Sequence, residues 1–335
     1  MGNLPAPRVT PNLPFQISGV DFAGPFFITD RKGRGCKLSK CYLCLFVCLA
    51  TKALHLECAS DLSTEVFMLC LRRFISRRGK PSELYCDNGT NFVGASNEIA
   101  NFLRSSNNDM FSSAASEGIN FIFSPAYSPH FGGLWEAGVK SAKFHLTRIL
   151  GNQHMTFEEL STLFAQIEAI LNSRPLTPLS CDPNDLHPLT PGHFLIGRTL
   201  TSLPSPTLLD INTNRLSRYQ HIEQMRQHFW ERWRREYLSE LQQRNKWKVN
   251  QQGLQEGEMV ILKDVNLPPL KWRTGRIYKL YPGADGIARV ADIKTSKGII
   301  RRALNKVCPL LPSSSYSTSR NPDVFEGGED VPERN

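Results

Sequence analysis

The sequence predicts a mixed α/β fold, in which helices cover a mixed sheet, followed by a second, smaller β unit. Three observations support this prediction. Short apolar segments first follow one another as strands and then alternate with helical segments, up to about residue 175. A proline-rich stretch over residues 174–214 interrupts this pattern, and short segments separated by Gly and Pro resume after residue 256. A chain of 335 residues is long enough for two folded units and tails.

The first unit is expected to contain five strands and four helices. Ser63 or Thr64 is suited to cap the first helix, and Thr156 with Glu159 forms a capping-box pattern before the last one. The expected strands cover residues 15–29, 40–49, 53–59, 84–86 and 119–123. The first expected helix starts within residues 61–65 and runs to about residue 78, and the others cover residues 94–104, 133–150 and 156–172.

The chain as a whole divides into five regions. A helix is expected at residues 216–241, and the Ser-rich and then acidic end of the chain is expected to be disordered. The regions are an extended lead-in (1–14), an α/β core (15–175), a Pro-rich connector with a basic helix (176–250), a small β-barrel (251–311) and the tail (312–335).

Positive charge is concentrated in one part of the chain. Residues 198–306 carry 21 Lys and Arg against 10 Asp and Glu, whereas residues 1–197 carry 17 against 16, and residues 307–335 carry 2 against 5. A basic block in a folded region attracts polyanions, because each neutralised phosphate releases counterions. Nucleic acid is therefore the favoured partner, and an anionic membrane surface is the lesser one.

The N-terminus lacks the apolar segment of a signal peptide, and the longest apolar run, residues 41–50, is too short to span a bilayer. We therefore expect a soluble intracellular protein. Its nine cysteines include Cys36, Cys41, Cys44 and Cys48 close together, which raises the possibility of zinc. However, Cys41 and Cys44 lie three positions apart on an expected strand and face opposite sides. Reduced thiols in the core are favoured.

Three acidic residues occupy unusual positions. Asp21 lies inside an apolar strand, Asp87 follows a strand end, and Glu136 lies one turn into a helix that begins after two glycines. A buried carboxylate is costly unless it is paired or bound to a metal. Taken singly, each position has a plainer explanation, since Asp21 could cap the turn before residues 24–25 and residues 87–89 could be merely a turn. Taken together, in this order, they favour a shared site.

At these residues the chain resembles the DDE integrases and transposases, whose core has a ribonuclease H-like fold. The matching segments are residues 19–25 (GVDFAGP), 86–92 (CDNGTNF) and 130–136 (HFGGLWE). Residues 171–177 (LNSRPLT) and 189–197 (LTPGHFLIG) make the chain similar, more narrowly, to the Bel/Pao class of long-terminal-repeat retrotransposons. The resemblance covers about residues 1–311. It implies a mixed five-stranded ribonuclease H-like sheet with flanking helices, a helical linker and a small SH3-like β-barrel.

The resemblance implies a polynucleotidyl transferase that processes DNA ends and transfers strands, with an associated nuclease activity. In the family pattern Asp21 bridges two metal ions, and Asp87 and Glu136 each complete one metal site. Two Mg²⁺ ions ~4 Å apart, with Mn²⁺ as a substitute, can activate the attacking hydroxyl and stabilise the leaving oxygen. Magnesium prefers oxygen ligands, so a few carboxylates suffice.

Two features depart from the family pattern. Asp87 and Glu136 are separated by 48 residues, more than in the retroviral relatives, and the excess fits an insertion at residues 105–117. A His/His/Cys/Cys zinc module normally precedes this core, whereas this sequence starts at the linker after that module. The sequence is then either a piece of a longer protein or a copy that has lost the module.

DNA contacts are expected around the three carboxylates. Lysines lie four and seven positions after Glu136 and share its helix face, although a solvated face with a Glu136–Lys140 pair is the alternative. The loop before the two glycines is expected to be a hinged flap near the DNA end, and His130 is disfavoured as a magnesium ligand. The expected contacts are Asn88, Tyr127, His130, Lys140 and Lys143.

Further contacts are expected in the C-terminal part. Phe229, Trp230 and Trp233 have helical spacing and are expected to be packed core rather than base-stacking platforms. The basic residues around them favour phosphate binding over a solvated face. They are Arg226, Arg232, Arg234, Arg235, Arg244, Lys246 and Lys248. Residues 256–262 and 272–277 resemble strands of the integrase SH3-like barrel, which in the family binds DNA and helps to assemble multimers. The residues expected to project from it are Lys271, Arg273 and Arg276.

The favoured function is that of a retrotransposon integrase, which acts as a homo-oligomer on double-stranded DNA of the element ends and of the target. Such a protein would be made in the cytoplasm and act on chromosomal DNA in the nucleus. Two alternatives stay open. A catalytically silent or domesticated copy would bind DNA without integrating it, and a metal-dependent nuclease of the same fold would cut RNA or DNA.

Overall fold

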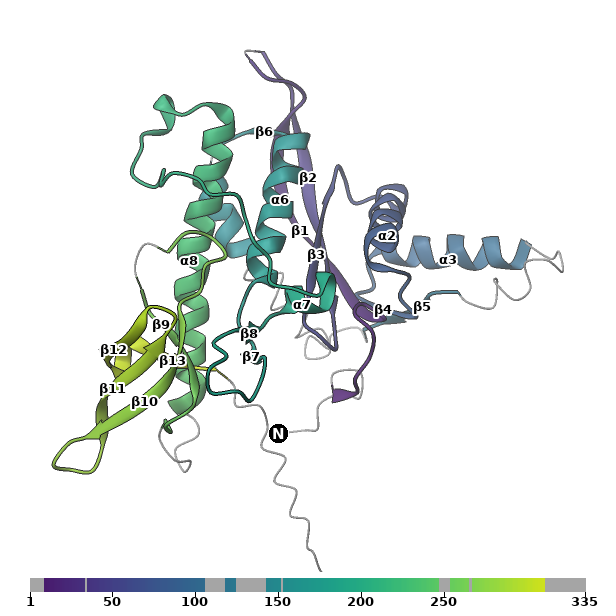
Figure 1. Cartoon of the computed structure of the whole chain (residues 1–335). Helices are drawn as coiled ribbons and strands as arrows, with labels where there is room; N and C mark the ends of the chain where they lie inside the picture. The colour runs from purple at the N-terminus through teal and green to yellow at the C-terminus, as the bar shows by residue number, and fades with distance from the viewer. Residues whose placement is uncertain are drawn as a thin grey trace, which may run out of the picture.

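An α/β core and a smaller β unit lie on either side of one long helix (Figure 1). No helix of the described residues is long and apolar enough to cross a membrane. The computed structural model describes residues 9–33, 35–105, 118–124, 143–151, 153–246, 254–264 and 267–310.

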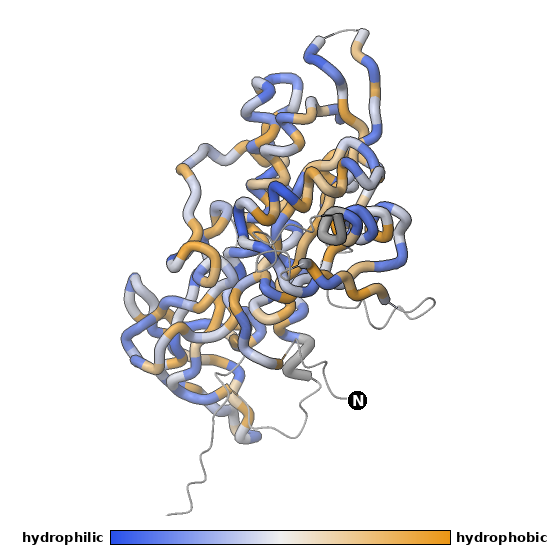
Figure 2. Tube along the Cα trace, turned by 90° about the vertical axis from the view of Figure 1, so that its right-hand side faces the viewer, coloured by the Kyte–Doolittle hydropathy of each residue, from blue (hydrophilic) through white to orange (hydrophobic). Residues whose placement is uncertain are grey.

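The core is built on a mixed sheet. Its main strands are β1 (Ile17–Thr29), β2 (Leu38–Cys48), β3 (Leu54–Ala59), β4 (Glu83–Cys86) and β5 (Asn120–Phe123), in the order β3-β2-β1-β4-β5. The first three strands form an antiparallel meander, and β4 and β5 join β1 in parallel. The mixed sheet predicted from the sequence is therefore confirmed. The hairpin of β1 and β2 projects beyond the helices in both views (Figures 1 and 2).

A short strand, β6 (Met155–Thr156), adds to the five predicted strands. It pairs in parallel with Ile28 and Thr29, near the end of β1. The prediction gave Thr156 only a capping role, because a strand of two residues carries no periodicity that a sequence pattern could reveal. Burial of Met155 in the core contributes to this pairing.

Two helices of the core begin where their caps predict. The Oγ of Ser63 accepts a backbone N–H at 3.3 Å and caps α2 (Thr64–Arg78). Thr156 and Glu159 form the predicted capping box at the start of α6 (Phe157–Asn172). Each cap satisfies backbone N–H groups that the first turn leaves without intrahelical partners.

The helix after β4 begins earlier than predicted. α3 (Thr90–Ser105) starts four residues before the expected range of 94–104. The side chain of Phe92 is buried, so the first turn belongs to the packed structure and not to a loop. Gly94 instead marks the contact between α3 and α2, since a Cβ there would lie 2.3 Å from the Oγ1 of Thr64.

The sheet separates two apolar layers. On β2, Leu43 and Leu45 lie in the core that includes α6, whereas Cys44 and Phe46 lie in the core that includes α2. We call these sides the α6 face and the α2 face. Cys41 lies on the α6 face, so Cys41 and Cys44 point to opposite sides of the sheet, as predicted. All nine cysteines are free thiols.

The connector and the long helix follow the core. They contain β7 (Thr177–Pro178), β8 (Pro188–Leu189), α7 (Pro191–Ile196), the 3₁₀ helix η1 (Thr213–Arg215) and α8 (Arg218–Lys246). Phe229, Trp230 and Trp233 of α8 are buried on the α6 face, which confirms that they are packed core. Further along, Leu238 and Leu241 pack against the C-terminal sheet. α8 therefore contributes to the cores of both units (Figure 1).

The C-terminal unit is a five-stranded antiparallel sheet, with the strand order β12-β11-β10-β9-β13. Its elements are β9 (Met259–Leu262), β10 (Thr274–Pro282), β11 (Ala288–Thr295), β12 (Gly298–Ala303), the 3₁₀ helix η2 (Leu304–Lys306) and β13 (Val307–Pro309). Short strands in this antiparallel order fit the small SH3-like domain predicted for this region.

Candidate active site

Asp21 lies on β1, the central strand of the core sheet. Opposite it on β2 is the buried Leu45. Its neighbours Val20 and Phe22 both pack on the α2 face. Because successive side chains of a strand alternate, the partly exposed carboxylate of Asp21 is directed to the α6 face. Its Oδ1 accepts the N–H of Phe22 at 2.7 Å.

Asp87 directly follows the end of β4, the strand that pairs in parallel with β1. The parallel pairing of β1 with β4 matches Gly19 with Tyr85, so two more residues along each strand bring Asp21 opposite Asp87. Neighbouring strands lie about 4.8 Å apart. Tyr85 packs on the α6 face, and a residue two positions further along the same strand direction shares that face. The two aspartates thus belong to one end of two adjacent parallel strands.

The turn after β4 orients Asp87. Its Oδ1 accepts the N–H of Gly89 at 2.9 Å, which is the turn expected as the plainer explanation of residues 87–89. The side-chain amide of Asn88 donates to the carbonyl of Ser124 at 2.9 Å and ties this turn to the end of β5. Asp87 is exposed, and a carboxylate has further lone pairs, so the turn is compatible with a metal ligand.

Cys86 lies next to Asp87, and its surroundings favour the protonated thiol. Burial raises the pKa of Cys86 to about 12, and the negative charge of Asp87 adds to the effect. The thiolate is the reactive form of cysteine, and at neutral pH this side chain is a thiol.

The third predicted carboxylate, Glu136, lies outside the described residues, as do Tyr127, His130 and Lys140. The described end of that segment, residues 143–150, is helical. Its Leu146 and Leu150 are buried on the α6 face, the same face to which Asp21 is directed. Lys143 is exposed at the start of this helical stretch.

Among the described residues, no three His, Cys, Asp or Glu side chains come together as a metal site. Asp21 and Asp87 supply two of the three predicted ligands. Their carboxylate oxygens are the donors that Mg²⁺ prefers, and their neighbouring register positions suit ions shared by several carboxylates. The described part of the predicted donor set therefore fits divalent magnesium.

Among the arginines expected to contact DNA, Arg226 is 6% exposed and pairs with Glu223. Arg234 and Arg276 are buried as well, which corrects these assignments. Arg276 is 9% exposed, and its guanidinium donates to the carbonyls of Asp185, Gly257 and Ser180 at 3.0–3.1 Å. Arg234, a residue of α8, is 5% exposed. Neither guanidinium presents a surface to a DNA backbone. The charge pattern could not reveal this, because it counts charges without their burial.

The other predicted C-terminal contacts are nearer the surface. Lys271 is exposed. Arg235 is also exposed and pairs with Glu231 one turn away on α8. Arg273 is partly exposed and pairs with Asp264. The Arg235–Glu231 pair is the more exposed of the two, and exposed ion pairs contribute little to stability.

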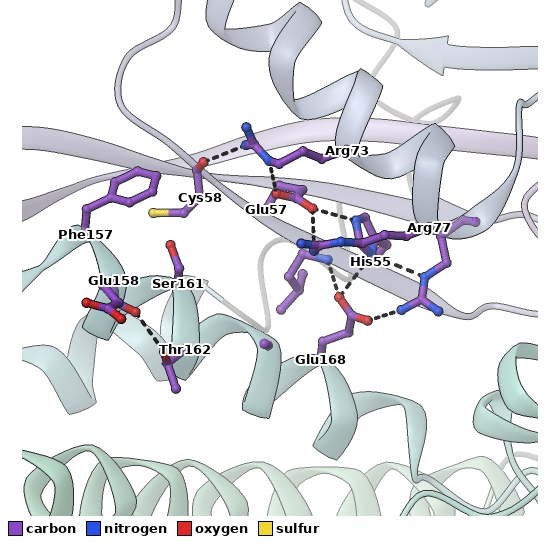
Figure 3. A pocket seen from close by; sticks show the side chains of 13 residues that line it. His55, Glu57, Cys58, Arg73, Arg77, Phe157, Glu158, Ser161, Thr162 and Glu168 are labelled. Atoms are coloured by element: carbon purple, nitrogen blue, oxygen red, sulfur yellow. Dashed lines mark hydrogen bonds and ion pairs between the residues drawn. The ribbon is translucent and has the colours of Figure 1, made fainter.

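A second group of charged side chains lies at β3 and was not predicted. It borders a cavity of about 570 Å³ between β3, α2 and α6 (Figure 3). His55 is buried between Glu57 and Glu168, with Nε2 and Nδ1 3.0 and 3.2 Å from their carboxylates. Arginines of α2 pair with both carboxylates. The available signal was the i, i+2 spacing of His55 and Glu57, which puts both on one face of a strand.

The charged side chains at β3 differ from the predicted metal site, because their carboxylates are paired with His and Arg side chains. Burial alone would lower the pKa of His55, but its hydrogen bonds to Glu168 and Glu57 outweigh burial and raise the pKa. Glu168 also accepts the N–H of Leu56 at 2.8 Å. Each carboxylate thus has cationic or backbone partners, which is how buried charges are stabilised.

Comparison with known proteins gives distant matches. Residues 217–310, which comprise α8 and the C-terminal sheet, match a family model described as a family of unknown function (DUF5641). Comparison with curated proteins finds no match. A chain of the simian T-cell lymphotropic virus intasome, in complex with PP2A regulatory subunit B56 gamma, is similar over 93% of this chain and 84% of that chain, at 12% identity and a TM-score of 0.37. The catalytic core domain of BIV integrase is similar over 55% of this chain and 95% of that chain, at 15% identity and a TM-score of 0.36.

Proposed function

We propose that the chain is the integrase of a Bel/Pao-type long-terminal-repeat retrotransposon, which processes DNA ends and joins them to target DNA. The observation that supports this proposal is the register of β1 and β4, which ends at Gly19 and Tyr85 and, continued by two residues, would bring Asp21 opposite Asp87. The segments around both residues are also those in which the sequence resembles DDE integrases. A pair of carboxylates at one end of adjacent parallel strands is a suitable base for binding divalent cations.

In this proposal Asp21, Asp87 and Glu136 hold two Mg²⁺ ions. When bound, the ions would activate the attacking hydroxyl and stabilise the leaving oxygen of the phosphodiester. The protein's own part is positional. Gly89 and Asn88 fix the turn that orients Asp87. The buried Leu45 lies opposite Asp21 on the neighbouring strand. No covalent nucleophile is required.

The surroundings of the site would hold the DNA. Basic side chains position phosphates, whereas contacts to bases give sequence preference. The end of the DNA would meet Asn88, Tyr127, His130, Lys140 and Lys143. α8 would add Arg235, and the C-terminal unit would add Lys271 and Arg273, whereas burial removes Arg234 and Arg276 from this set. A homo-oligomer bound to both DNA ends, acting in the nucleus, completes the proposal.

A strand-transfer assay tests this function. The chain is incubated with Mg²⁺, labelled terminal-repeat DNA and a target plasmid, beside the variants Asp21→Asn and Asp87→Asn. We expect joined products with the wild type only, and DNA binding with all three proteins. DNA binding without joined products, equal in wild type and variants, would instead identify a catalytically silent DNA-binding protein. Mg²⁺-dependent cutting without joining would identify a nuclease.

A further inference from the structure

A cavity of about 230 Å³ lies between α8, the connector and the loop that precedes β10. Residues 205–209 of the connector form one side, and residues 267–269 form another. The indole N–H of Trp230 donates to the carbonyl of Leu267 at 2.7 Å and holds this loop over the helix. The cavity is distinct from the predicted metal site, since it contains neither Asp21 nor Asp87.

Arg234 lines this cavity, and no acidic side chain of the described residues forms an ion pair with it. It is 5% exposed, and its Nε and Nη1 atoms are buried with no hydrogen-bond partner. Its guanidinium carbon lies 5.7 Å from the centre of a ring of Trp230, which is a weak compensation for a buried charge. Burial lowers the pKa of Arg234, but a guanidinium stays charged in proteins. A buried cation of this kind requires an anionic partner.

The nearest carboxylates are paired with other arginines. Glu231 also lines the cavity, but its carboxylate is bound by the exposed Arg235. Asp264, the other acid near Arg234, pairs with Arg273 at 2.5 Å. Within the described part of the chain, the charge of Arg234 is therefore left for a group that enters the cavity.

The walls of the cavity define the chemistry of that group. Leu209, Trp230, Pro268 and Pro269 provide apolar surface, and the hydroxyl-bearing Thr207 lies on the same lining. A space of about 230 Å³ admits side chains, whereas a DNA duplex, whose major groove alone is about 12 Å wide, cannot enter it. An oxyanion next to an apolar group matches this lining better than a DNA backbone does.

We propose that this cavity binds an acidic side chain of a partner peptide, with its carboxylate on Arg234 and an adjacent apolar side chain against Trp230 and Pro268. Carboxylates are bound by guanidinium groups through charge-assisted hydrogen bonds, which are strongest where water is excluded. The cavity is then a protein-docking site on the side of α8, separate from DNA joining.

Thermal unfolding of the whole chain tests the site with a matched pair of blocked peptides, N-acetyl-Phe-Glu-amide and N-acetyl-Phe-Gln-amide. A ligand that binds only the folded state raises the Tm. We expect the Glu peptide to raise the Tm of the wild type and of Arg235→Gln, but not of Arg234→Met. The Gln peptide should raise none of them. Without peptide, Arg234→Met should not lower the Tm, because it removes an uncompensated buried charge.

Four outcomes would overturn the proposal. The first is an equal shift, or none, of the wild-type Tm by the two peptides, a comparison that needs no variant to fold. The second is a response of Arg234→Met to the Glu peptide. The third is a lower Tm of unliganded Arg234→Met that Glu231→Gln reproduces, since Glu231 would then be its internal partner. The fourth is a shift caused by a short DNA duplex that Arg234→Met alone abolishes, which would assign the site to phosphate.

Discussion

At the residue scale, the missing side chain of Gly89 leaves room for the carboxylate of Asp87. A Cβ at Gly89 would lie 2.9 Å from the Oδ1 of Asp87 and 2.6 Å from the Oδ1 of Asn91. Both atoms end flexible side chains, so they can move aside at little cost in stability. The carboxylate of Asp87 would, however, be displaced from its present orientation.

We therefore predict that Gly89→Ala keeps the fold but loses activity. A displacement of about 1 Å at a reacting site can cost on the order of 100-fold in rate. The measurement is the strand-transfer rate together with the Tm, with Thr90→Ala at the exposed start of α3 as the control. Activity near that of the wild type, at an unchanged Tm, would mean that the orientation of Asp87 does not matter.

Arg276 and Lys271 have opposite roles in the same sheet region. Arg276→Gln should lower the free energy of unfolding by about 1–3 kcal/mol, because it removes the donors of three part-buried hydrogen bonds to carbonyls. Lys271→Gln should leave stability unchanged and reduce the slope of DNA affinity against salt by about one. Denaturant unfolding and DNA titrations at several salt concentrations measure both effects. A loss of DNA affinity in a stable Arg276→Gln protein would restore its assignment to the DNA surface.

Residue types in sequence order were enough to predict some of these roles and not others. Asp21 and Asp87 stand in distinctive motifs, and the helical spacing of Trp230 and Trp233 predicted their packing. Burial of Arg234 depends on how the connector and a distant loop meet α8, and no local pattern encodes that meeting.

At the scale of elements, the backbone of the edge strand β3 is bound by side chains of α6. The amide of Asn172 accepts the N–H of Leu54 at 2.8 Å and donates to its carbonyl at 2.7 Å. Glu168 accepts the N–H of Leu56. An uncovered edge strand is a template for pairing with another chain, so these contacts fix α6 against β3 and block that pairing.

The network beside this edge predicts a pH-dependent stability. The pKa of His55 is raised by its hydrogen bonds to Glu168 and Glu57. A histidine with a raised pKa contributes stability that is complete below its unfolded pKa of about 6.5 and is lost as pH rises through the folded-state value. The Tm should therefore fall as pH rises above about 6.5, and His55→Gln should weaken this dependence. If the Tm of the wild type and that of His55→Gln changed equally with pH, His55 would not be the source of the pH dependence.

Element boundaries were predictable where capping chemistry or alternation is local. The caps at Ser63 and Thr156 and the alternation along β2 are examples. The early start of α3 was missed because Phe92 is held by tertiary packing, which overrides the loop-like sequence before it.

At the scale of the whole molecule, α8 and the connector join the core to the C-terminal unit. Trp272, in the loop before β10, packs against Trp230 and Trp233 of α8, and its indole N–H donates to the Oγ of Ser173 at 3.2 Å. Arg276 in β10 binds carbonyls of the connector. The basic C-terminal unit is thus fixed relative to the sheet that carries Asp21.

Crystals soaked in MnCl₂, with anomalous scattering recorded at the manganese edge, give the most direct test that Asp21 and Asp87 form a shared metal site. Mn²⁺ substitutes for Mg²⁺ at oxygen ligands and can be located by its scattering. We predict a peak within bonding distance of both carboxylates in the wild type and its loss in Asp87→Asn. A peak that touches neither aspartate, or no peak in the wild type at saturating Mn²⁺, would contradict the proposed site.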